Sequence, residues 1–151
     1  MGKDRYVRHK WIGAAALIWA FAGLVGSLHA ATVMVTTTQD GAAGSITGCS
    51  LREAVQAINN QSNGNGCTNS GEPYGTNDQI RFATGVNNIS LTFLPNPLAR
   101  TALSLQRPMT IRGRGSGTTI ISGGGGDHVL ITNLSQLVLR SLSLVNAGNG
   151  L

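Results

Sequence analysis

From Ile80 onward the chain is a succession of very short apolar stretches, and this pattern constrains the fold more than any other feature. Each stretch is three to five residues long, and Gly, Asn, Pro or Ser separates nearly every pair. Strands this short at this spacing predict a solenoid, in which each coil packs against the next. No apolar stripe of helical period occurs in this half. The predicted strands cover residues 80–82, 89–93, 103–105, 109–111, 119–122, 129–132, 137–139 and 142–145.

The last six stretches can be aligned as two coils of a three-sided parallel β-helix, with 23 to 28 residues between equivalent positions. A register shifted by one strand is nearly as compatible with the sequence. A small antiparallel sandwich, in which neighbouring stretches form hairpins, is the alternative fold. In the aligned register the neighbours are Leu103 and Val129, Met109 and Leu137, and Thr119 and Leu142.

One short amphipathic helix is expected before these strands, over residues 51–59. Ser50 and Glu53 have the spacing of a capping box, in which each side chain binds a backbone N–H of the other residue. Polar turn formers in residues 59–64 end the helical pattern. Its apolar face, at i, i+3, i+4 and i+7, consists of Leu51, Ala54, Val55 and Ile58.

The first 30 residues have the features of a secretory signal peptide. Four basic residues in the first ten precede an uncharged apolar run over residues 11–28, and Ala30 and Ala31 follow. Cleavage is expected after Ala30 or Ala31. No adjacent Arg pair is present, which favours the general secretion route. The alternative is an uncleaved anchor, because 18 apolar residues are at the short end for a membrane span.

Removal of residues 1–30 would leave a chain of low net charge. They contain four of the eleven Lys and Arg and one of the six Asp and Glu, which leaves seven basic and five acidic residues. No Lys occurs after residue 30. Nucleic-acid binding requires a basic patch. Seven scattered Arg do not form one, so no nucleic-acid partner is expected.

Two cysteines, Cys49 and Cys67, follow the predicted signal peptide. An even count in an exported chain predicts a disulfide. Free thiols are one alternative and a metal site is another, but a metal needs more ligands than two Cys, and His128 is far away in sequence. We expect no metal and no cofactor.

The hexapeptide Cys49–Ala54, CSLREA, resembles the signature of the CSLREA-type N-terminal domain of exported bacterial right-handed parallel β-helix proteins. A Val-Thr-Thr-Thr stretch with Asp40-Gly41 before it, and Asp78–Phe82 after it, resemble the family's flanks. Residues 137–148 resemble its strand-turn-strand-Asn-x-Gly coils. The resemblance covers residues 32–148.

The resemblance implies an all-β fold, the start of a right-handed parallel β-helix, with one short N-terminal capping helix. Such a cap covers the apolar end and the open strand edges of the first coil. Residues 31–79 are then the cap segment, and residues 80–151 are the first two to three coils. Because family members are longer, we expect this chain to be an N-terminal fragment with further coils missing.

The resemblance also implies a non-catalytic surface or extracellular module for adhesion or scaffolding, in the outer membrane or secreted. Cell-surface glycans or other surface proteins would be its partners. The alternative is the N-terminal part of a polysaccharide lyase or glycoside hydrolase whose active coils are missing. Such enzymes need acids grouped in a groove, whereas the acids here are scattered. We therefore expect no catalytic residue, and we expect Arg52 to pair with Asp78 across the cap.

Three smaller motifs are interpreted as coil corners. Residues 123–126 with Asp127 form one imperfect copy of a calcium-binding nonapeptide, which works only by repetition. Asp127 and His128 have no nucleophile marked beside them. Asn133 and Asn146 each follow a strand and are expected to bond the backbone there.

Overall fold

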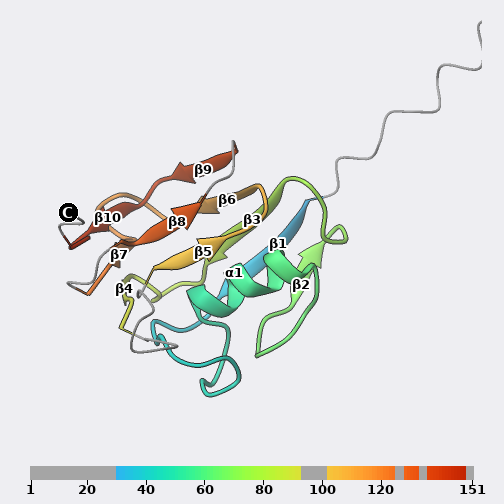
Figure 1. Cartoon of the computed structure of the whole chain (residues 1–151), viewed down its shortest axis with the longest axis horizontal. Coiled ribbons are helices and arrows are strands. Elements are labelled where there is room, and N and C mark those ends of the chain that lie inside the picture. The colour runs from blue at the N-terminus through green and yellow to red at the C-terminus, as the bar shows by residue number, and fades with distance from the viewer. Residues whose placement is uncertain (1–29, 93–101, 125–127, 133–135, 149–151) are drawn as a thin grey trace, which may run out of the picture.

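A computed structural model describes residues 30–92, 102–124, 128–132 and 136–148, and these residues are mostly β-strands with one helix (Figure 1). The predicted signal peptide therefore lies outside the described residues, except for Ala30. The elements are β1 (Ala31–Val35), α1 (Leu51–Asn60), β2 (Asn69–Gly71), β3 (Asp78–Phe82), β4 (Asn88–Ser90), β5 (Leu103–Leu105), β6 (Met109–Arg112), β7 (Ile120–Ser122), β8 (Leu130–Thr132), β9 (Leu137–Arg140) and β10 (Ser143–Val145).

The strands form three sheets, with the orders β2-β1-β3-β6-β9, β10-β7-β4 and β5-β8. From β3 onward the chain visits these sheets in a constant rotation, so that β3, β6 and β9 belong to one sheet, β4, β7 and β10 to another, and β5 and β8 to the last. Every pairing among these strands is parallel. The hairpins of the alternative sandwich are not present among the described strands. β1 pairs in parallel with β3 on one side and antiparallel with β2 on the other.

The observed register agrees closely with the sequence alignment. Met109 lies beside Leu137, as predicted. β7 and β10 keep the predicted offset, since Ile120 lies beside Ser143. The third pair is off by one residue: Leu103 lies beside Leu130, and its amide donates to the Val129 carbonyl at 2.9 Å.

The core is built from ladders of equivalent side chains. Successive residues of a strand point to opposite faces, so every second residue of each strand faces inward. Val33 of β1, Ile80 of β3 and Ile111 of β6 follow one another in register and are each 0% exposed. Ile89 and Ile121 form a second ladder in the β4–β7 sheet. The ladders explain why short alternating stretches suffice, because each strand packs its inward apolar side chains against those of the strand beside it in register.

Several element boundaries differ from the sequence prediction. β1 ends at Val35, before the three Thr residues that follow it, because the amides of Thr36 and Thr37 both donate to the Cys49 carbonyl, at 2.8 and 3.3 Å. The predicted strand 89–93 is β4, Asn88–Ser90. The amide of Leu91 still donates to the Ser122 carbonyl at 2.8 Å.

Candidate functional site

The start of α1 is fixed by the predicted capping box. The Ser50 hydroxyl accepts from the Glu53 amide at 3.2 Å, and the Ser50 amide donates to Glu53 Oε2 at 3.0 Å. The other carboxylate oxygen of Glu53 accepts from the Gly44 amide at 3.1 Å. Glu53 is 1% exposed, so its carboxylate joins the preceding loop to the helix rather than facing solvent.

Replacing Ser50 by Ala is expected to lower the free energy of unfolding by about 1 kcal/mol, because the Glu53 amide loses its acceptor. Ser50→Thr retains a hydroxyl and is the matched control. Urea unfolding followed by circular dichroism measures both. Equal stability of the alanine and threonine variants would contradict this role for the hydroxyl.

The apolar face of α1 closes one end of the strand stack. Its predicted members, Leu51, Ala54, Val55 and Ile58, are between 0% and 2% exposed. The helix packs against β1, β3 and β5. In Figure 1, α1 and β2 lie on the side of the molecule opposite to β9 and β10. The helix therefore covers the first strands of two sheets.

A disulfide joins Cys49, just before α1, to Cys67, just before β2. Both cysteines are 1% exposed. Gly66 beside it has a φ of 77°, and a Cβ there would collide with the Gly48 carbonyl oxygen. The disulfide thus brings the β2 segment back to β1, where β2 occupies one edge of the largest sheet.

Arg52 pairs with Asp40, and the predicted pair with Asp78 is wrong. Arg52 Nε lies 2.7 Å from Asp40 Oδ1, and Nη2 lies 2.9 Å from Oδ2. Asp40 also accepts from the Thr92 amide at 2.8 Å, and Arg52 Nη1 donates to the Ala102 carbonyl at 3.4 Å. The two side chains are 10% and 1% exposed. This buried pair fastens the β4–β5 connection to the helix.

Asp78 instead accepts from two backbone amides. Its Oδ1 lies 2.9 Å from the Ala31 nitrogen, and its carboxylate oxygens lie 3.0 and 3.1 Å from the Gly75 nitrogen. Asp78 is 0% exposed. Burial raises the pKa of the nearby Tyr74 phenol, and the Asp78 charge raises it further. Sequence spacing gave no indication of these contacts.

Among the described residues, the strands at the opposite end of the stack have one unpaired edge each. β9, β10 and β8 are each the last strand of their sheet. The inward ladders end there in exposed side chains: Leu139, which continues the Ile80–Ile111 ladder, is 38% exposed, and Leu144, which continues the Ile89–Ile121 ladder, is 39% exposed. Unpaired strand edges with apolar side chains are templates for further strands.

Val138→Lys on the outward face of β9 is expected to reduce self-association of the protein at least severalfold, because a charge on an edge strand opposes pairing. Thr110→Lys, at the equivalent position of the interior strand β6, adds the same charge away from the edge and is the control. Sedimentation velocity over a range of concentrations measures the effect. If both variants self-associate like the wild type, the edge is not the site of association.

A groove of about 590 Å³ lies between α1 and β5. Five of its eleven lining residues carry amide side chains, each of which can both donate and accept hydrogen bonds. The Asn59 side chain already makes two hydrogen bonds: it donates to the Ser104 carbonyl and accepts from the Gln106 amide, both at 2.9 Å. The other amides lining the groove are Gln56, Asn60, Asn65 and Gln106.

The remaining sequence motifs contribute little to a site. Asn146 has a φ of 50°, and its amide donates to the Ser122 hydroxyl at 3.2 Å rather than to backbone. Asp127, Asn133 and residues 125–126 lie outside the described residues. Within the described ranges, no group of three or more His, Cys, Asp or Glu is arranged to bind a metal. In the same ranges no helix reaches the length and hydropathy of a membrane span.

Comparison of the chain with models of known protein families, with curated proteins and with solved structures finds no match.

Proposed function

We propose that this chain is the N-terminal capped end of an exported, right-handed parallel β-helix of the CSLREA type that serves as a non-catalytic surface scaffold or adhesion module. The observation that carries the proposal is the difference between the two ends of the stack. One end is closed by α1, β2 and the Cys49–Cys67 disulfide, whereas the other ends in exposed Leu139 and Leu144. A unit closed at one end is suited to begin a longer stack.

The contacts of the buried acids support a structural role. Glu53 binds the amides of Ser50 and Gly44, Asp40 binds Arg52, and Asp78 binds the amides of Ala31 and Gly75. Each carboxylate is therefore engaged in fixing backbone or a helix end. General acids and bases must instead reach a substrate in a cleft.

We propose the amide-lined groove between α1 and β5 as the contact for surface glycans. Sugar hydroxyls both donate and accept, as side-chain amides do. The volume of about 590 Å³ lies within the usual range for small-ligand sites, roughly 300–1,000 Å³.

A cell-retention experiment tests this function. Bacteria that export the full chain are passed over immobilised polysaccharides, and we expect more retained cells than with an empty vector. Asn60→Ala combined with Gln106→Ala should reduce retention, whereas Asn87→Ala, which removes an exposed amide outside the groove, should not. Release of new reducing ends or unsaturated sugars by the protein would instead support a carbohydrate-active enzyme.

A further inference from the structure

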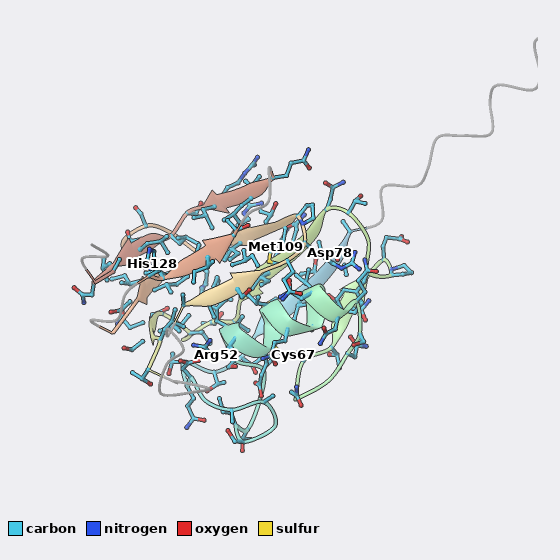
Figure 2. All side chains as sticks on the ribbon, viewed as in Figure 1. Arg52, Cys67, Asp78, Met109 and His128 are labelled. Atoms are coloured by element: carbon cyan, nitrogen blue, oxygen red, sulfur yellow. A yellow bond between two sulfur atoms is a disulfide. The ribbon has the colours of Figure 1, made fainter. Side chains whose placement is uncertain are left out.

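Asp78 occupies a position that is apolar in the following coils. In the parallel register it lies beside Met109, and Met109 lies beside Leu137. Asp78 is 0% exposed and Met109 is 3% exposed. Figure 2 shows the two residues next to each other, near the start of β1. In this ladder, β3 therefore has a carboxylate at the position where β6 and β9 have apolar side chains.

The carboxylate of Asp78 binds backbone amides. In the part of the chain that the structure describes, no Lys or Arg side chain lies within ion-pair distance of it. Its partners are the backbone nitrogens of Ala31 and Gly75. A buried carboxylate without a cation is costly. The Asp78 charge also acts on the Tyr74 phenol, and a neutral phenol supplies no positive charge.

The Ala31 nitrogen, which Asp78 binds, belongs to one of the two peptide bonds at which the sequence predicts cleavage. Hydrolysis of the Ala30–Ala31 bond consumes one water, leaves a carboxylate on Ala30 and an amine on Ala31, and the amine takes up a proton at neutral pH. The new ammonium would lie where the Ala31 nitrogen now lies, 2.9 Å from Asp78 Oδ1.

We propose that Asp78 is a built-in receptor for the α-ammonium group that cleavage between Ala30 and Ala31 creates, so that signal removal completes a buried ion pair and locks the first strand. The position of the ammonium is set by β1, since Thr32 lies beside Gln79 on one side and Ser70 on the other. Charge-assisted hydrogen bonds are roughly twice as strong as neutral ones. The inference rests on the proposed export.

The geometry distinguishes the two cleavage sites. Cleavage after Ala31 would remove the nitrogen that Asp78 binds, together with a residue that is 0% exposed. Cleavage after Ala30 keeps both. Because Ala31 is buried in the folded protein, the cut must be made on the unfolded chain during export, before β1 joins β3.

The absence of Lys after residue 30 gives a direct test. In a chain that starts at Ala31, the α-amine is the only primary amine, so an amine-reactive ester reports on it alone. The full chain is expressed with its leader, the exported protein is purified, and its intact mass is measured. The rate of amine acylation is then compared between native and urea-unfolded protein, for the wild type and for Asp78→Asn.

We expect a mass that begins at Ala31 and at least tenfold slower acylation in the native protein, because an ammonium paired with a carboxylate releases its proton less readily. Asp78→Asn should abolish most of this protection. Arg52→Met combined with Asp40→Asn removes a different buried carboxylate together with its cation, and its native protein should remain protected. If both variants lose protection from acylation equally, the folded state as a whole has become less stable, and the inference is overturned.

The remaining outcomes separate this inference from the proposed function. Exported protein that begins at Thr32, retains Met1, or begins at Ala31 without protection overturns the ion pair and leaves export standing. Protein that stays in the cytoplasm with Met1 intact overturns the proposed function, and the ion pair with it.

Discussion

Replacing both Cys49 and Cys67 by serine is expected to lower the free energy of unfolding by about 3 kcal/mol. The disulfide closes a loop with a sequence separation of 18 residues, and loops of this size give about that stabilisation in the chain-entropy model. The loss has a structural consequence as well. Without the disulfide, the polar segment that contains β2 has no covalent cross-link that holds it beside β1.

Urea unfolding of the exported protein, with and without reductant, measures this effect. Reductant should bring the wild type to the stability of the double serine variant and should leave that variant unchanged. Hydrogen exchange adds a local measurement, because the amides of β2 should lose protection before those of β6. If complete reduction leaves the unfolding midpoint of the wild type unchanged, the cap is held by its non-covalent contacts alone.

The parts of the fold that sequence could predict are those with local signals. The capping box follows from two residues three apart, Ser50 and Glu53, and both contacts are present. The ladder that aligns Met109 with Leu137 follows from equal alternation in two stretches, and it is present as well. In each case the residues that determine the structure lie close together in the chain or repeat along it.

The parts that sequence could not predict depend on distant contacts. Asn69–Gly71 has no strand propensity and is a strand only because β1 lies beside it. The sequence led us to expect a pair between Arg52 and Asp78, whereas the partner of Arg52 is Asp40, because spacing along the chain carries no signal for which distant acid lies beside it. The loop before the helix determines the partner. The Cys49 amide donates to the Thr36 hydroxyl at 2.9 Å, and the loop between these two residues contains Asp40, which contacts Arg52.

The Arg52–Asp40 pair is the second interaction with a large expected effect. Arg52→Ala should lower the free energy of unfolding by about 3 to 5 kcal/mol, the usual cost of leaving one member of a buried ion pair without its partner. The Asp40 side chain is 1% exposed, so water cannot replace the lost guanidinium without opening the cap. The Thr92 amide would still donate to Asp40, but an amide does not neutralise the charge of a carboxylate.

Two further variants show whether this cost arises from the stranded charge. Arg81→Ala removes an exposed arginine whose guanidinium donates to the Gln79 side chain at 3.2 Å, and it should change stability by less than about 0.5 kcal/mol. Arg52→Met combined with Asp40→Asn removes both charges and keeps the volume, so it should be more stable than Arg52→Ala. Thermal unfolding of the three variants decides. If the double variant is as unstable as Arg52→Ala, the contribution comes from the hydrogen bonds that the Arg52 guanidinium donates to Asp40 and Ala102, and not from the charge of Asp40.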